Sequence, residues 1–403
     1  MPDAVPTAGR RVCVVTGTRA EYGLMHHLIN AINDANDLTL QLVVTGMHLS
    51  PEFGLTYRQI ESDGHRIDRK VEMLLSADTP SAITKSTGLG MIGLADAMAE
   101  LSPDLMVILG DRFEILAAAV AAMHARVPIA HLHGGETTEG ATDEGIRHAV
   151  TKLSHLHFVA AEEYRRRVIQ LGESPDRVFH VGGLGVDAIA RTERLSRGDL
   201  SNQLGLDLSG RYLLVAYHPV TLEQETAADQ FDELTEALES LPADFRFVIT
   251  EPNADADGRV IIERIAAFVA RHPERAASFQ SLGRVRYWSA MEFCAAVVGN
   301  SSSGLLEAPT FGIPTVDIGD RQRGRLRADS VLGCPPDRKS IADALDRALS
   351  DEFKRHCGDV TNPYGRPDTV GRILTVLRET VLNEALLKKH FHDLPLGGST
   401  VNP

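Results

Sequence analysis

The chain has 403 residues, of which 43% are hydrophobic and 24% are charged, and its formal net charge is -14. This composition is typical of a globular enzyme, and the length is enough for two domains. The negative charge argues against a surface that binds nucleic acid or an anionic membrane, although a local pocket of arginines and backbone N–H groups can still hold a phosphorylated ligand.

In the first half of the chain, short apolar runs alternate with amphipathic helical stretches. The runs expected to form buried strands are residues 11–17, 38–46, 104–111, 127–135 and 156–161. They are continuously apolar, as strands are when helices cover both faces of a sheet. Helical patterns at 113–125 and 146–154 lie between them, so this order of elements predicts a doubly wound α/β sheet.

The strand pattern starts again after a polar stretch at residues 191–210, where we place a domain junction. The second set of expected strands comprises residues 212–219, 245–253, 295–301 and 313–319. We therefore expect one Rossmann-like domain over 11–195 and a second over 205–362, facing each other across a cleft. Because α/β sheets bind ligands at the carboxyl ends of their strands, polar residues at those ends are the candidates for function.

The cysteines and the N-terminus indicate the cellular compartment. The four cysteines (Cys13, Cys294, Cys334 and Cys357) show no C-x-x-C pair and no zinc-binding spacing. The first residues, MPDAVPTAGRR, lack the apolar core of a signal peptide, and no apolar run is long enough to span a bilayer. We therefore expect a cytoplasmic protein.

The segment GNSSSGLLEAP (299–309) is the strongest single signal of a binding site. Small hydroxyl residues and a glycine follow a strand and open a helix, where free N–H groups and the helix dipole favour a phosphate. Glu307, one turn further on, can accept hydrogen bonds from a ribose. The alternative is an ordinary helix cap by Ser302 or Ser303, and the local sequence does not decide between the two. There is no G-x-x-x-x-G-K-[ST] or G-x-G-x-x-G motif, which argues against an ATPase or a dinucleotide site.

Arginines occur at two further strand ends. Arg19, in GTRAEYG, lies at a strand-to-helix turn, and Arg321, Arg323 and Arg325, in DIGDRQRGR, follow a later strand. A guanidinium suits a phosphate because it can donate two parallel hydrogen bonds. The alternatives are a surface arginine beside a helix and a solvated basic loop.

Three carboxylates are candidate proton carriers. Asp111 follows an apolar strand, Glu136 lies in a glycine-rich loop, and Asp143 comes just before the helical pattern that begins at residue 146. The alternative for Asp111 is an ion pair with Arg112, and the alternative for Asp143 is a helix cap. Glu136 has no obvious structural role.

A metal site is a weaker hypothesis. His131 and His133, in HLHGGE, alternate along a strand and so share one of its faces, as metal ligands can. His218, Asp111 or Asp143 would have to complete such a site. No H-E-x-x-H motif occurs, and an isolated H-x-H is a weak signal, so we prefer acid/base chemistry.

The motifs GTRAEYG, GDRFE, HLHGGE, IRHAVTKLSHLHF, HP, PNADADG, GNSSSGLLEAP and IGDRQRGR occur in one order along nearly the whole chain. Together they closely resemble those of the hydrolysing UDP-N-acetylglucosamine 2-epimerases of sialic and related nonulosonic acid synthesis. The resemblance covers roughly residues 11–380. It implies a fold like that of the two-domain GT-B glycosyltransferases, a C-terminal helix at 363–390 that crosses back to the first domain, a homodimer or homotetramer, and no obligatory metal or organic cofactor.

The resemblance also implies a reaction and a set of site residues. UDP-N-acetylglucosamine and water would give N-acetylmannosamine and UDP, by elimination of UDP to a glycal and hydration of that glycal. The implied catalytic residues are Asp111, Glu136, Asp143 and His218, and at least one of the clustered carboxyl groups should have a raised pKa. The implied UDP-binding residues are Arg19, Ala20, Glu21, Arg112, Asn253, Ser301, Ser302, Glu307 and Arg321.

Several alternatives stay open at this point. Close relatives of the family perform the same chemistry on UDP-N,N'-diacetylbacillosamine in legionaminic acid pathways, and one sequence does not separate the two sugars. A GT-B glycosyltransferase that uses a UDP-sugar would share the serine loop (Ser301, Ser302 and Ser303) but would need no carboxylate cluster. A nucleotide-sugar sensor would bind without releasing UDP, and a non-hydrolysing epimerase fits HLHGGE and GDRFE less well.

Overall fold

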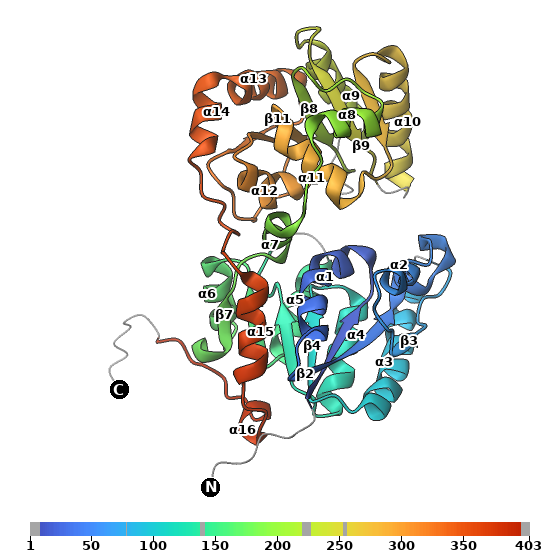
Figure 1. Ribbon diagram of the computed structural model, residues 1–403, viewed down its shortest axis with the longest axis vertical. Helices are drawn as coiled ribbons and strands as arrows, with labels where there is room; N and C mark the ends of the chain where they lie inside the picture. Colours follow the sequence, from blue (N-terminus) through green and yellow to red (C-terminus); the bar gives the residue numbers. More distant parts are fainter. Residues whose placement is uncertain (1–8, 78, 138–141, 220–226, 253–255, 396–403) are drawn as a thin grey trace, which may run out of the picture. The chain divides into compact units, whose positions relative to one another are not determined.

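The computed structural model describes residues 9–77, 79–137, 142–219, 227–252 and 256–395, without the side chains of 256–259. The chain divides into two compact units. Unit 1 comprises Met1–Asp187 and Arg366–Pro403, and unit 2 comprises Ala188–Gly365. Both are layered α/β structures (Figure 1).

Unit 1 is built on a parallel sheet. Within its described residues the strand order is β3-β2-β1-β4-β5-β6-β7, and every neighbouring pair is parallel. The strands are β1 (Arg10–Thr16), β2 (Leu38–Thr45), β3 (Arg69–Val71), β4 (Leu105–Leu109), β5 (Ile129–Leu132), β6 (Leu156–Val159) and β7 (Val178–His180).

The central strands of unit 1 are apolar throughout because both faces of the sheet are covered. Along β4, Val107 packs into one hydrophobic cluster, whereas Met106 and Ile108 pack into another on the opposite face. Each apolar side chain that leaves water on folding contributes roughly 1.5–3 kcal/mol. Burial on both faces therefore explains the unbroken apolar runs of the sequence.

The helices of unit 1 cover this sheet, and the end of the chain adds to them. The helices are α1 (Arg19–Asn33), α2 (Tyr57–Ser62), α3 (Pro80–Leu101), α4 (Phe113–His124), α5 (Thr142–Leu153), α6 (Glu162–Gln170), the start of α7 (Leu184–Arg191), α15 (Thr369–Glu379) and α16 (Glu384–Leu387), with short 3-10 turns at Gly46–Leu49, Pro51–Phe53 and Pro175–Arg177. Val370, Ile373 and Leu377 of α15 are buried in the same cluster as residues of α1 and β1. The last helices are thus part of the core of unit 1.

Unit 2 repeats the architecture with the strand order β10-β9-β8-β11-β12-β13, again parallel throughout its described residues. The strands are β8 (Tyr212–Ala216), β9 (Arg246–Thr250), β10 (Ala276–Phe279), β11 (Ala296–Gly299), β12 (Thr315–Ile318) and β13 (Val331–Cys334). The helices are α8 (Arg197–Leu204), α9 (Ala227–Glu239), α10 (Ala256–Arg271), α11 (Gly283–Phe293), α12 (Ser303–Leu306), α13 (Arg338–Leu349) and α14 (Asp351–Gly358), with a 3-10 turn at Ala308–Phe311.

Two parallel α/β sheets confirm the fold class that the sequence predicted. Residues 191–210, expected to form a polar junction, include helix α8, and Leu200 and Leu208 from this stretch are buried in the core of unit 2. The leucines are isolated among polar residues, so they form no apolar run in the sequence.

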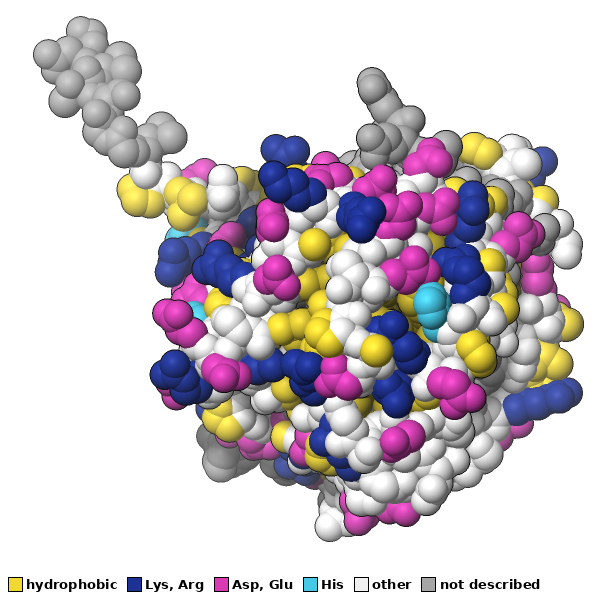
Figure 2. Space-filling model, turned by 90° about the horizontal axis from the view of Figure 1, so that it is seen from above, with side chains coloured by type: hydrophobic (Ala, Val, Ile, Leu, Met, Phe, Trp, Pro, Cys, Tyr) yellow, Lys and Arg dark blue, Asp and Glu magenta, His cyan; other side chains and the backbone are white. Residues whose placement is uncertain are grey.

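Two further features concern the charges on the surface and the lengths of the apolar helices. On the face seen in Figure 2, basic and acidic side chains are interspersed. Within the part of the chain that the structure describes, no helix is both long enough and apolar enough to cross a bilayer.

Candidate active site

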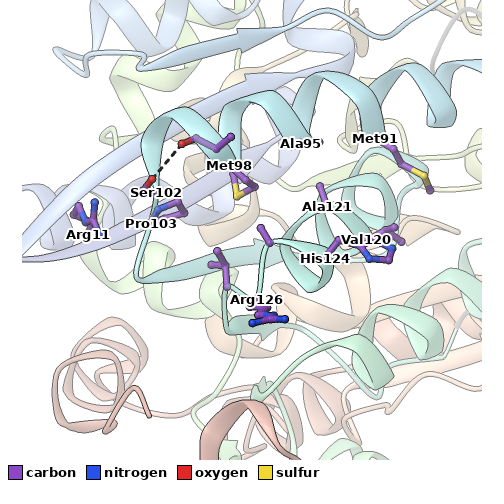
Figure 3. A pocket seen from close by; sticks show the side chains of 13 residues that line it. Arg11, Met91, Ala95, Met98, Ser102, Pro103, Val120, Ala121, His124 and Arg126 are labelled. Atoms are coloured by element: carbon purple, nitrogen blue, oxygen red, sulfur yellow. Dashed lines mark hydrogen bonds between the residues drawn. The ribbon is translucent and has the colours of Figure 1, made fainter. Parts of the chain in front are cut away.

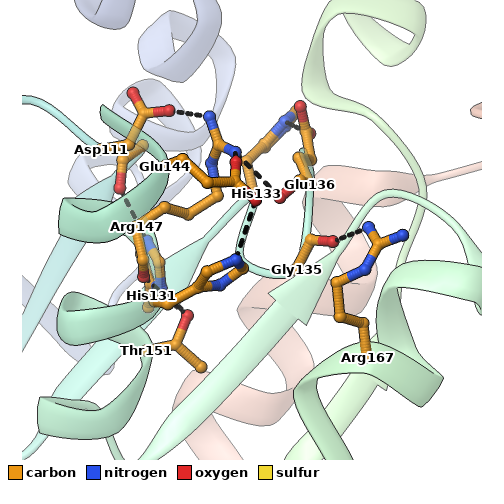
Figure 4. Close-up of polar contacts among 11 residues, drawn as sticks. Asp111, His131, His133, Gly135, Glu136, Glu144, Arg147, Thr151 and Arg167 are labelled. Carbon is orange, nitrogen blue, oxygen red and sulfur yellow. Dashed lines mark hydrogen bonds and ion pairs between the residues drawn. The ribbon is translucent and has the colours of Figure 1, made fainter. Parts of the chain in front are cut away.

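The predicted carboxylates lie where β4 and β5 end in unit 1 (Figure 4). Asp111 follows β4 through Gly110, whose φ of +85° is a left-handed conformation that favours glycine. Arg147 of α5, which is 3% exposed, donates to the Asp111 carboxylate. Its other terminal nitrogen donates to the carbonyl of Glu136 and to Glu144 Oε2, each at 2.8 Å. One guanidinium therefore holds together both strand ends and the helix.

Asp143 belongs to the same cluster. It lies in the first turn of α5, which begins at Thr142, and so it is not the residue that caps this helix. Burial raises the pKa of Asp143, and the nearby charge of Asp111 raises it further, although Arg112 and Arg147 oppose the shift. A raised pKa is what the sequence predicted for at least one of these carboxyl groups.

The two histidines of HLHGGE support the strand ends in different ways. His131 is buried, and burial lowers its pKa to about 3, so the ring is neutral. Its Nε2 lies 2.8 Å from the carbonyl oxygen of Gly110, and its Nδ1 lies 3.3 Å from the Thr151 hydroxyl. Both ring nitrogens of His131 thus contact protein atoms, one of them in Gly110, the residue before Asp111. His133 instead places Nδ1 2.7 Å from Glu136 Oε1 (Figure 4).

The same region gives no support to the metal hypothesis. Among the residues that the structure describes, no group of three or more histidine, cysteine, aspartate or glutamate side chains is arranged to hold a metal ion.

Arg112 faces a different partner from the one considered in the sequence. Its Nε and Nη2 donate to Glu114 at 3.2 and 3.1 Å, whereas Asp111 pairs with Arg147. Glu114 is fully buried at the start of α4. The alternative of an Asp111–Arg112 ion pair is therefore wrong, and Glu114 fixes the direction of the Arg112 guanidinium.

The turn after β1 is closed by Glu21. The Glu21 carboxylate accepts a hydrogen bond from the Gly17 N–H at 2.8 Å, and its own N–H donates at 3.2 Å to the hydroxyl of Thr18, the N-cap of α1. Burial raises the pKa of Glu21 to about 7. Arg19 and Ala20 are exposed at the first turn of α1.

In unit 2 the candidate residues converge on Asn300, which follows β11 and is fully buried. The Asn300 amide accepts from the His218 N–H at 2.7 Å and donates to the His218 carbonyl at 2.8 Å, so it joins the ends of β8 and β11. The Asn300 carbonyl accepts from Arg321 Nη1 at 3.0 Å and from Gln322 at 2.8 Å. His218 and Arg321 are thus fixed beside the serine loop through a residue that the sequence did not single out.

The serine loop itself differs from the expectation. Helix α12 is a single turn, so the dipole of a long helix is not available to an anion. Ser302 is the cap residue but makes no side-chain cap bond, so the capping alternative is wrong for Ser302. The Ser301 hydroxyl lies 3.1 Å from that of Ser303, which is in turn 2.5 Å from the Tyr287 hydroxyl. The donors that could meet a phosphate are therefore the hydroxyls and N–H groups of the loop.

Glu307 and Asn253 complete the predicted set. Glu307 Oε2 accepts from the Trp288 indole N–H at 3.0 Å, and burial raises the pKa of Glu307 to about 7. Asn253 lies outside the described residues.

The surface pocket of unit 1 between α3 and α4 lies away from this cluster (Figure 3). It has a volume of about 840 Å³, and Arg11, Pro103 and Val127, which lie where β1, β4 and β5 begin, are among its lining residues. Ligands of α/β sheets bind at the carboxyl ends of the strands, where Asp111 lies, and not at the amino ends.

Three side chains that organise these sites were missing from the predicted set: Arg147, Glu114 and Asn300. For Arg147 and Glu114 the sequence did contain a clue, because each is a charged residue at a helix position that must be buried. Glu114, for example, lies close to the alanines of α4.

Comparison with known proteins identifies similar chains. Residues 30–378 match the family described as UDP-N-acetylglucosamine 2-epimerase. The GDP/UDP-N,N'-diacetylbacillosamine 2-epimerase (hydrolyzing) of Campylobacter jejuni is 38% identical over 385 residues, which cover 96% of this chain and 99% of that protein. The UDP-N,N'-diacetylbacillosamine 2-epimerase (hydrolyzing) of Legionella pneumophila is 34% identical, and the alignment covers 94% and 98% of the two chains.

A solved structure shares the fold. The UDP-GlcNAc 2-epimerase of Neisseria meningitidis, whose crystal structure contains bound UDP-GlcNAc, superimposes with a TM-score of 0.79. The match covers 92% of this chain and all of the other, at 18% sequence identity. This agreement supports the two-sheet architecture.

Proposed function

Because the chain belongs to the UDP-N-acetylglucosamine 2-epimerase family, we propose that it is a hydrolysing 2-epimerase of UDP-linked 2-acetamido sugars. The proposed reaction converts UDP-N-acetylglucosamine and water to N-acetylmannosamine and UDP. A base removes the proton at carbon 2 while the bond from carbon 1 to UDP breaks with its electron pair, which leaves a glycal. Water then adds at carbon 1, and an acid returns a proton to carbon 2 on the opposite face.

The carboxyl cluster of unit 1 is the observation that carries this proposal. Asp111 is ion-paired with Arg147, and burial together with the charge of Asp111 raises the pKa of Asp143. Elimination followed by hydration needs one group that accepts a proton and one that delivers a proton beside the same carbon. Asp111, Asp143 and Glu136 supply such groups at one edge of one sheet.

The proposed UDP contacts are given for each unit by itself. In unit 2, Ser301 and Ser302 of the serine loop, Arg321 and His218 would offer charge-assisted hydrogen bonds to the diphosphate. In unit 1, Arg19 and Arg112 are proposed as phosphate ligands on the resemblance. His218 would also assist the departure of UDP, and Glu307 would accept from the ribose. The remaining proposed contacts, Ala20, Glu21 and Asn253, rest on the resemblance alone.

Turnover in deuterated water tests the reaction. The wild-type protein is expected to release UDP and a 2-acetamido sugar with inverted carbon 2 that carries deuterium, both visible by NMR. Asp111→Asn and Glu136→Gln should fold and bind UDP but lose about 100-fold or more in kcat. The matched control is Asp96→Asn on the exposed face of α3. UDP-sugar turnover that leaves carbon 2 unlabelled would indicate a glycosyltransferase or a simple hydrolase.

UDP-N,N'-diacetylbacillosamine is a second candidate substrate. The observation that favours it is that the names of both relatives described above contain diacetylbacillosamine. That sugar differs from N-acetylglucosamine at carbons 4 and 6 and leaves the chemistry at carbons 1 and 2 the same. Parallel incubations with the two UDP-sugars, compared by kcat/KM, assign the substrate. The better substrate is expected to exceed the other by about 10-fold or more.

The phosphate contacts have their own test. Ser302→Ala combined with Arg321→Ala should weaken UDP binding by about 10- to 100-fold, since charge-assisted hydrogen bonds are lost. Isothermal calorimetry measures this, with Lys339→Ala on the exposed surface of α13 as the control. The same affinity in the double variant and in the control would remove the serine loop from the site.

We also propose that the protein forms a homo-oligomer through α3 and α4. Ile92 and Met123 on these helices are 66% and 41% exposed and are next in sequence to Met91 and His124, which line the pocket of Figure 3. Exposed apolar side chains of this kind mark contact surfaces. Ile92→Glu should lower the molar mass measured by light scattering, whereas Val381→Glu, at another exposed apolar position, should not. A monomeric wild-type protein would contradict the proposal.

A further inference from the structure

His133 adopts an unusual backbone conformation directly after β5. Its φ is +63°, in the left-handed region that residues with side chains rarely occupy. This conformation is strained for a residue with a side chain and persists where the surroundings require it, often at functional sites. At this position it brings the imidazole to the carboxylate of Glu136, with 2.7 Å between Nδ1 and Oε1 (Figure 4).

The other side of the ring fixes which nitrogen carries the proton. The backbone N–H of Leu184, the first residue of α7, lies 3.4 Å from His133 Nε2. The first N–H groups of a helix have no partner within the helix and can only donate. Nε2 therefore accepts, and the hydrogen of the ring lies on Nδ1, which donates it to Glu136.

Other elements also contact the loop that carries Glu136. Arg147 of α5 donates to the Glu136 carbonyl at 2.8 Å, and Arg167 of α6 donates to the carbonyl of Gly135. These bonds hold the backbone of the loop, whereas His133 contacts the carboxylate itself. Among the described residues, the charged or titratable side chains of this cluster include Asp111 after β4, His131 and His133 at the end of β5, Asp143, Glu144 and Arg147 of α5, and Arg167 of α6.

We infer that His133 is a positioning residue for Glu136: through its Nδ1–H it orients the carboxylate and keeps it ionised, so that Glu136 acts as a base. This inference rests on the proposed function, because Glu136 needs a basic form only if it takes part in proton transfer. His133 acts through Glu136 and is not itself assigned a contact with the substrate. A donor to the charged form of a carboxyl group lowers the pH at which it becomes protonated.

Two substitutions separate the hydrogen bond from the backbone conformation. Asparagine and glycine both tolerate the left-handed region, but only His133→Asn keeps an N–H donor near the place of Nδ1. His133→Gly should move the acidic limb of the kcat/KM profile up by about 1 pH unit and lower kcat about 10-fold or more, with UDP affinity within about 2-fold of wild type. His133→Asn should restore most of the rate and the wild-type limb.

The outcomes distinguish this inference from the proposed function. A wild-type protein without turnover refutes the function, whereas an active wild type whose limb does not move in His133→Gly refutes the role of His133. Equal impairment of both variants refutes it as well. If His133→Gly does not fold, nitrogen-15 NMR of labelled histidines in the wild-type protein still decides, because a proton on Nε2 of His133 would contradict the inference.

Discussion

Asn300→Ala is expected to disconnect β8 from the serine loop in unit 2. The Asn300 amide satisfies both backbone groups of His218, accepting from its N–H at 2.7 Å and donating to its carbonyl at 2.8 Å. Alanine can make neither bond. The backbone carbonyl of residue 300 would keep its donors, Arg321 and Gln322, so the loss is confined to the link with His218.

The cost follows from the number of groups left without a partner. A buried donor or acceptor that loses its hydrogen bond costs about 1–3 kcal/mol. Two such groups give about 2–6 kcal/mol, and the lower half of this range, about 2–4 kcal/mol, is expected because His218 is only partly buried. With a urea dependence of about 2 kcal/mol per molar, the midpoint of unfolding should fall by about 1–2 M.

The sequence offers a probe for this unit alone. Trp288 is the only tryptophan of the chain, and it lies in unit 2 with 4% exposure, so its fluorescence reports the unfolding of unit 2. Asn202→Ala on the exposed face of α8 is the matched control and should change stability by less than about 0.5 kcal/mol. UDP affinity should also fall in Asn300→Ala only. If both variants unfold at the same urea concentration, the assigned role of Asn300 is wrong.

Substitutions at three further positions test other parts of the structure. Burial alone would raise the pKa of Glu173, but hydrogen bonds from His157 and two lysines lower this pKa from the ordinary 4.5 to about 2. The ionised Glu173 therefore stabilises the folded protein above pH 4.5, and this contribution is lost as the pH falls toward 2. Glu173→Gln should therefore show a smaller loss of stability by circular dichroism between pH 5 and 3 than wild type, and parallel curves would contradict this. Arg147→Met leaves the Asp111 charge without its partner and should cost about 3 kcal/mol in thermal unfolding, with Arg147→Lys in between; a cost below about 1 kcal/mol would dismiss the ion pair. Gly299 has a φ of +135°, and the Cβ added in Gly299→Ala would lie 2.1 Å from the carbonyl oxygen of Ala216. We therefore expect little folded protein on expression. A normal yield and a normal melting temperature would refute this.

The central strands could be predicted from the sequence, whereas the edge strands could not. β4 and β8 are apolar at every position because both faces are buried, and unbroken runs of this kind stand out in the sequence. The unpredicted strands are β3, β7, β10 and β13, and these are the outer strands of the two sheets. Edge strands are short and less buried, as Arg69-Lys70-Val71 of β3 illustrates, so they leave no apolar run.

The positions of the candidate side chains could be predicted, but their partners could not. Strand ends placed Asp111 and Glu136 correctly at one edge of the sheet, because the carboxyl ends of parallel strands share that edge. Arg147 is 36 residues from Asp111, and Asn300 is 82 residues from His218. Contacts of that span depend on how helices pack on the sheet and on which strands become neighbours, which local sequence patterns do not encode.

The division of the candidate residues between the units bears on which reaction the chain performs. The serine loop, Asn300 and Arg321 of unit 2 would suit any enzyme that holds the diphosphate of a UDP-sugar, a glycosyltransferase included. A transferase has no need for a cluster of carboxyl groups that accept and deliver protons, whereas inversion of carbon 2 has that need. Asp111 is ion-paired with Arg147, and burial together with the charge of Asp111 raises the pKa of Asp143. The carboxyl cluster of unit 1, and not the serine loop of unit 2, therefore distinguishes the proposed epimerase from a transferase.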